Sequence, residues 1–187
     1  PVLLKDPERD RFKGHFIAVR DGRAEIHNGV TLQIRGGTWT RRWLKRGMVI
    51  SFSARSPFEG YRQINLRGQW HDESNIREQL GYDLFNELGV AAPRSRPARV
   101  HLNGELLGVY SEVEMIDAIF LARNGMAGGV LYQALVPKRQ SGPDRCDGQA
   151  YSTVAGYEAH WSKRTHLDEP YDDLARFVDG MHMTRDE

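Results

Sequence analysis

The sequence predicts an α+β fold in which a meander of short antiparallel strands packs with helices. Two turn-forming pairs, Asp21-Gly22 and Asn28-Gly29, separate short apolar runs near the start of the chain, which is typical of β-hairpins. Apolar residues then recur at every fourth position from Ile76 to Leu88, which indicates an amphipathic helix. Asn103-Gly104 separates two further strand-like runs and predicts a second hairpin region.

Composition places the chain among ordinary globular proteins. Of its 187 residues, 40% are hydrophobic and 27% are charged, so a sizeable core can form without disulfide or metal support. The single Cys146 cannot form an intrachain disulfide. No apolar run approaches the roughly 18 residues of a membrane span. The net charge of +1 gives no general attraction to nucleic acid, which is therefore not expected as a partner.

The first half of the chain is expected to contain the strand meander and one long helix. Strands are predicted over residues 12–20, 23–27, 30–35, 47–55 and 61–67. The helix is predicted over residues 72–88, with Asp72 or Ser74 as its cap. Arg77 falls inside the apolar face of this helix, where an unpaired charge is costly. Its guanidinium should therefore bind an anion at a site, or else reach the edge of the face or pair with a core carboxylate.

The second half begins with a hairpin whose second strand ends in two carboxylates. Glu112 and Glu114 are two residues apart, so they should point to the same face. A short helix over 115–123 and a short strand over 130–134 follow. Residues 137–153 are rich in Pro, Gly and Ser and indicate a loop. Helical spacing of apolar residues predicts a last helix over 171–181.

A basic turn is the strongest local charge signal. From Ile26 to Phe58 there is no Asp or Glu, whereas six Arg or Lys residues occur. The turn contains Arg35, Gly36, Gly37, Lys45 and Arg46. Glycine N–H groups combined with basic side chains can form a phosphate cradle. The alternative is a solvated basic hairpin with no ligand.

The sequence contains no motif typical of a zinc site, of a catalytic nucleophile or of a P-loop. The seven histidines show no HxxxH or HExxH spacing, so a zinc site is not predicted. There is no GxSxG motif and no GxxxxGK[ST] motif, which leaves nucleophilic catalysis and a P-loop without an anchor.

The order of several motifs resembles the spore-coat protein H (CotH) kinase family over roughly residues 30–135. The matching pieces are IRGG at 34–37, WLKR at 43–46, ISF at 50–52, DESNIREQL at 72–80, ELGVAAP at 87–93, HLNGELLGVYSEVEMIDAIFL at 101–121 and GGVLYQA at 128–134. The Asn-Gly hairpin makes this succession specific, whereas each piece alone is common.

The resemblance implies a reduced, atypical protein-kinase fold that uses ATP and Mg to phosphorylate protein side chains. Residues 1–135 would form the nucleotide-facing lobe, and residues 136–187 would begin the second lobe. The resemblance also implies a bacterial cell-surface, exported or spore-coat location. The residues implied to bind the cofactor are Arg35, Gly36, Gly37, Thr38, Lys45, Arg46, Arg77, Glu112 and Glu114.

The chain departs from the family pattern downstream. The family's catalytic Asp–Asn stretch and its later metal-binding Asp are not found before the chain ends. Phosphoryl transfer needs metal ions and a residue that orients the nucleophile. Weak or absent kinase activity is therefore expected if the sequence is complete, and a nucleotide-side lobe without the catalytic machinery if it is a fragment; catalytic residues are unknown. Two alternatives remain: a non-catalytic surface or spore-coat module that keeps the fold, and a nucleic-acid binder that uses residues 35–46 and 94–99.

Overall fold

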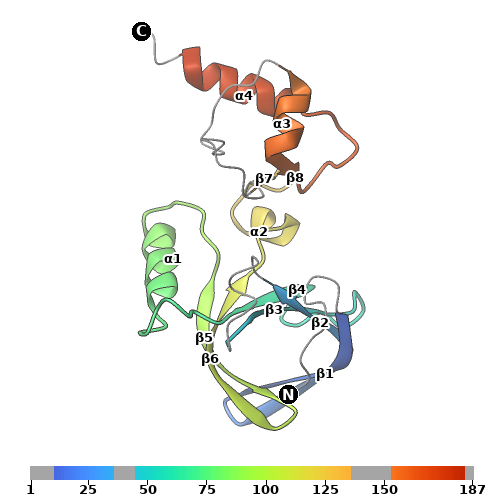
Figure 1. Ribbon diagram of the computed structural model, residues 1–187, viewed down its shortest axis with the longest axis vertical. Coiled ribbons are helices and arrows are strands. Elements are labelled where there is room, and N and C mark those ends of the chain that lie inside the picture. Colours follow the sequence, from blue (N-terminus) through green and yellow to red (C-terminus); the bar gives the residue numbers. More distant parts are fainter. Residues whose placement is uncertain (1–10, 36–44, 136–152, 184–187) are drawn as a thin grey trace. The chain divides into compact units, whose positions relative to one another are not determined.

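A computed structural model describes residues 11–35, 45–135 and 153–183, and it divides the chain into two compact units, Pro1–Phe120 and Leu121–Glu187. The order of elements is mixed, with helices between and after antiparallel strands (Figure 1). The α+β prediction is therefore confirmed. The lobe division expected at residue 135 stays a prediction.

The first unit is built on a curled six-stranded antiparallel sheet with the order β1-β2-β3-β4-β6-β5 (Figure 1). Its strands are β1 (Arg11–Arg20), β2 (Arg23–Arg35), β3 (Gly47–Ser51), β4 (Gln63–Arg67), β5 (Ser95–Leu102) and β6 (Glu105–Glu114). Asp21-Gly22 and Asn103-Gly104 form the expected turns, because Asp21, Gly22, Asn103 and Gly104 all have the positive φ that such turns require.

The predicted turn at Asn28-Gly29 is wrong, since β2 runs through it. His15 pairs with Asn28 and Gly14 pairs with Val30, so Gly29 is left over as a bulge. Gly29 has φ +68°, a conformation that glycine adopts without steric cost. The Asn-Gly signal thus marks an irregularity within one strand.

The core of the first unit lies on one face of the curled sheet. Its buried residues are Val30, Ile34, Met48, Ile50, Phe52, Phe58, Ile64, Leu66 and Tyr110. The phenylalanine rings pack edge-on and stacked, with Phe16 and Phe58 centroids 5.0 Å apart. Successive side chains of a strand point to opposite faces of the sheet, so the intervening side chains lie on the face opposite the core.

Helix α1 (Arg77–Glu87) is shorter than the predicted helix and contributes no buried residue. The periodic residues Leu80, Leu84 and Leu88 are 58%, 54% and 68% exposed. The expectation that this apolar face would be covered is therefore wrong within the described part of the chain.

The second unit has its own small core. Strands β7 (Tyr132–Ala134) and β8 (Trp161–Lys163) pair, and helices α3 (Val154–His160) and α4 (Asp172–Met183) pack with them. The short helix α2 (Ala118–Arg123) spans the division between the units. Helix α4 and strand β7 were predicted from the sequence, whereas α3 and β8 were not. None of the helices in the described ranges has the length and apolar character that a membrane crossing needs.

Candidate functional site

Arg35 lies at the end of β2 on the face opposite the core. Its neighbour Ile34 pairs with Met48, Met48 pairs with Leu66, and all three are buried in the core. Arg35 therefore points the other way, where its guanidinium donates to Asn65 Oδ1 and contacts Met115 Sδ at 3.7 Å. We call this surface the Arg35 face. Gly36, Gly37 and Thr38 lie outside the described residues.

Arg67 shares the Arg35 face and ties the sheet to α1. It follows Asn65 at the alternate position of β4. Its guanidinium donates to the carboxylate of Glu78, in the first turn of α1. Glu78 also accepts from the Gln69 amide and, at 3.1 Å, from the Tyr82 hydroxyl. One strand cation and one helix carboxylate thus fix where α1 begins beside the sheet.

Lys45 stands where the basic turn enters β3. Its ammonium donates to Asn75 Oδ1 at 2.8 Å and lies 5.3 Å from the centroid of the Tyr110 ring. Burial lowers the pKa of this lysine, because a charged ammonium loses hydration there. Arg46 follows it and is half-buried. The basic pair predicted from the sequence is therefore split between a lysine fixed to the start of α1 and an arginine beside it.

The start of α1 is organised by a buried aspartate. Asp72 Oδ2 accepts from the Arg77 N–H at 2.9 Å, and Asp72 Oδ1 accepts from the Ser74 N–H at 3.1 Å. The hydrogen bond from the Ser74 hydroxyl contributes most to lowering the pKa of Asp72. Asp72 thus satisfies the first N–H of the helix, although the residue at the helix boundary is Ile76.

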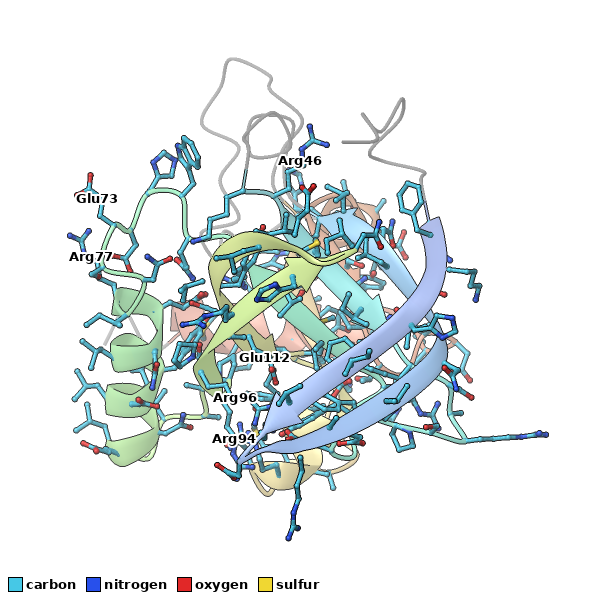
Figure 2. The ribbon with its side chains drawn as sticks, turned by 90° about the horizontal axis from the view of Figure 1, so that it is seen from below. Arg46, Glu73, Arg77, Arg94, Arg96 and Glu112 are labelled. Carbon is cyan, nitrogen blue, oxygen red and sulfur yellow. The ribbon has the colours of Figure 1, made fainter. Side chains whose placement is uncertain are left out.

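Arg77 does not occupy the inner position that the periodicity predicted. Its side chain is 77% exposed, and its Nε lies 3.5 Å from Asp72 Oδ1. Figure 2 shows Glu73 and Arg77 projecting outward at the start of α1, away from Arg94, Arg96 and Glu112. The inner position predicted for Arg77 was wrong, because the leucines that defined the inner face are themselves exposed. The guanidinium instead reaches solvent and the Asp72 carboxylate, which is the alternative that the sequence left open.

Glu112 and Glu114 share one face, as expected, but it is the core face. Glu112 pairs with Leu66 and Glu114 pairs with Ile64, both of which are core residues. The Glu112 carboxylate contacts Arg96 and lies 3.4 Å from Arg20 Nη2. Glu59 contacts the same two arginines, with Arg96 at 2.8 Å. We call these four residues the Arg–Glu quartet. Nucleotide binding by Glu112 stays a prediction.

The quartet borders a hollow of about 440 Å³. Glu114 lines it and accepts from the Arg94 N–H at 2.9 Å. The other lining residues are Glu59, Tyr61, Ile64, Asp83, Arg94, Ser95, Arg96 and Glu112. Its charged side chains are of both signs, and the arginines and glutamates of the quartet already neutralise one another.

Four residues of this region were not predicted as candidates from the sequence: Asn65, Arg67, Asn75 and Glu78. Asn65 and Arg67 share the Arg35 face through the ladders from β2 across β3 to β4, and the sequence does not fix that register. Among the described residues, no group of three or more His, Cys, Asp or Glu side chains could hold a metal ion.

Comparison with known proteins gives two matches. A family model described as CotH kinase protein matches residues 32–187. Inner spore coat protein H of Bacillus subtilis (strain 168) is 36% identical to the chain over 99 residues. This alignment covers 53% of the chain and 27% of that protein, so the chain spans about a quarter of the length of the curated relative.

Proposed function

The chain belongs to the CotH kinase protein family, and from this premise we propose that it binds ATP on the Arg35 face as the nucleotide-side part of a protein kinase. The observation that carries the proposal is the pair formed by Arg67 of β4 and Glu78 of α1. Protein kinases use a strand lysine paired with a helix glutamate to hold the phosphates of ATP, together with a glycine-rich loop that covers them.

The charges on this face suit a polyphosphate. Guanidinium groups bind phosphate oxygens through two parallel N–H donors, and both Arg35 and Arg67 lie here. Arg35 leads directly into Gly36-Gly37-Thr38, which we propose as the segment near the phosphates. Lys45 and Arg46, where the basic turn ends, are proposed as further phosphate contacts, and Arg77 as an exposed one.

Met115 supplies an apolar neighbour for the base. Its sulfur lies 3.7 Å from Arg35 Nη1 and also contacts the Asn65 amide. An adenine ring needs such an apolar surface beside polar groups that fix its orientation. Magnesium is proposed only as the ion that accompanies ATP, and we name no ligand for it in this chain. Phosphate transfer to protein side chains is proposed for the longer protein, on the family premise.

Calorimetric titration of the chain with Mg-ATP tests this function. We expect saturable binding, and we expect Arg67→Ala to weaken it by about tenfold, the effect of losing one charge-assisted hydrogen bond. Arg62→Ala is the matched control, since Arg62 is an exposed arginine just before the same strand. No heat at millimolar nucleotide, with the chain folded, would remove the nucleotide proposal.

A coat-binding role is the second candidate, because the relative named above is an inner spore coat protein. In this case the fold serves as a binding module, and the location would be the spore coat. Retention of coat proteins by the immobilised chain, both without ATP and with the Lys45→Ala variant, is the expected result. Loss of retention in that variant would favour the nucleotide role instead.

A further inference from the structure

Lys45 is held by more contacts than a solvated lysine of a basic turn would have. Its ammonium contacts Asn75 at 2.8 Å and faces the Tyr110 ring. Its backbone lies against Gly68, where an added Cβ would come within 2.3 Å of the Lys45 carbonyl oxygen. Its Cε lies 3.7 Å from the position of a Cβ on Gly108, which has φ +117°. The structure therefore fixes both ends of this side chain.

Asn75 is built to present an acceptor to that ammonium. Its backbone is left-handed, with φ +57°, which Asn tolerates better than most residues. Its N–H donates to the Asp72 carbonyl at 3.0 Å. Its Nδ2 donates to the Glu73 carbonyl at 3.1 Å. Because the amide nitrogen is occupied there, Oδ1 is the atom that faces Lys45.

An ammonium group has three N–H donors, and Asn75 occupies one of them. The remaining donors can bind an anion while the amide keeps the group in place. Asn75 is neutral, so it orients the ammonium without cancelling its charge. An aspartate at this position would instead pair with the lysine and compete with phosphate.

We propose that Asn75 is a positioning residue for Lys45: it holds the ammonium at the end of the basic turn for a phosphate group and thereby links phosphate binding to the start of α1. The inference rests on the proposed nucleotide function and adds to it a residue that contacts no ligand itself.

The test measures binding of Mg-ATP and of inorganic tripolyphosphate by the chain and by variants. Asn75→Gly removes the amide but keeps the left-handed backbone accessible, and Asn28→Gly, at the bulge of β2, is the matched control. We expect Lys45→Ala to weaken both ligands by about tenfold and Asn75→Gly by about fivefold. The double variant should be within about twofold of Lys45→Ala, since the two residues act as one unit.

A pH profile separates positioning from a general structural role. The elements around Lys45 carry Tyr110 on β6 and Asp72, Glu73 and Arg77 beside Asn75. Burial raises the pKa of Tyr110 and lowers the pKa of Lys45, because burial favours the uncharged form of each group. Loss of binding as the pH rises above neutral would therefore report Lys45. Asn75→Asp should move this loss to higher pH, because a carboxylate favours the ammonium form.

Each outcome decides between the two proposals. Binding by the parent chain that Lys45→Ala weakens but Asn75→Gly and Asn75→Asp leave unchanged would overturn the positioning role and leave the nucleotide function standing. Additive losses in the double variant would also overturn it. Absence of any binding by the folded parent chain would overturn both.

Discussion

Glu78 in the first turn of α1 holds Arg67 of β4, a residue eleven positions earlier in the chain. The Glu78 side chain is only 14% exposed, whereas that of Arg67 is 49% exposed. Because α1 buries none of its own residues, polar contacts rather than apolar packing set its place beside the sheet. The acceptor in this contact is therefore a sensitive point of the first unit.

We expect Glu78→Ala to lower the free energy of unfolding by about 1–2 kcal/mol, because three donors lose their shared acceptor. Half-exposure of Arg67 keeps the effect at this modest size. Urea titration followed by circular dichroism measures it. Glu73→Ala, which removes an exposed carboxylate from the segment before the same helix, should change stability by less than about 0.5 kcal/mol. Equal effects of the two variants would contradict the role given to Glu78.

Two glycines should respond in opposite directions to alanine. A Cβ on Gly68 would collide with the Lys45 backbone, so Gly68→Ala should destabilise the first unit by about 1–3 kcal/mol. Gly81 lies inside α1 with open space around it, so Gly81→Ala should stabilise by about 0.5–1 kcal/mol through helix propensity. Thermal unfolding of both variants beside the parent chain measures the signs. A stabilising Gly68→Ala would show that the close approach does not exist.

Asp72 should make the free energy of unfolding of the first unit depend on pH in the acidic range. Its folded-state pKa is depressed, chiefly by the Ser74 hydroxyl. Its contribution is therefore complete above the pKa of the unfolded chain and is lost as pH falls through the folded-state pKa. Asp72→Asn should be less stable than the parent near neutral pH, and the difference should shrink as the pH falls below the pKa of about 3.9 that an aspartate has in an unfolded chain. Denaturant titration at several pH values measures the difference, with Asp83→Asn on the exposed part of α1 as control. A stability difference between Asp72→Asn and the parent that stays constant with pH would refute the role given to the Asp72 carboxylate.

Lys163 should be the most sensitive residue of the second unit. Its side chain is 3% exposed, and its ammonium donates to the Pro170 carbonyl at 2.8 Å and lies 3.5 Å from Asp173. The rings of Tyr132 and Tyr171 flank it. Burial opposes the charged form of Asp173, but the hydrogen bond from Tyr132 and the nearby ammonium lower its pKa on balance.

We expect Lys163→Met to destabilise the second unit by about 2–4 kcal/mol, because Asp173 and the backbone carbonyls of Glu169 and Pro170 lose their partner. Faster hydrogen exchange in β8 and α4 is the measurement. Arg164→Met, at the exposed neighbouring position, should leave exchange unchanged. Protection that survives in Lys163→Met would mean that the apolar core around Tyr157 suffices.

Local signals predicted most of the elements. The hairpin at Asn103-Gly104 and the periodic helix near the end of the chain are confirmed as β5–β6 and α4, because turn chemistry and apolar spacing act over a few residues. Asn28-Gly29 was wrongly predicted to be a turn, because a glycine with positive φ fits a β-bulge as well as a turn. Helix α3 and strand β8 are short, and their apolar residues follow no clear helical or strand period. Neither element was therefore predicted.

The candidate site was harder to predict, because it depends on register. Arg35 was recognised from its basic surroundings, but Asn65 and Arg67 became neighbours of Arg35 only through the ladders from β2 across β3 to β4. Arg77 was placed inward on the assumption that an apolar stripe is always covered. The exposed Leu80 and Leu84 show why the stripe could not decide which way the guanidinium points.

The Arg–Glu quartet also changes what the first hairpin can do. Arg20 is the last residue of β1, immediately before the Asp21-Gly22 turn, and a hairpin tip is ordinarily the loosest part of a sheet. Here the ion pairs of Arg20 with Glu59 and Glu112 hold the tip against residues outside the hairpin. Higher ionic strength should therefore weaken these contacts and increase local opening of the hairpin, whereas in dilute buffer a protease should cleave the turn slowly.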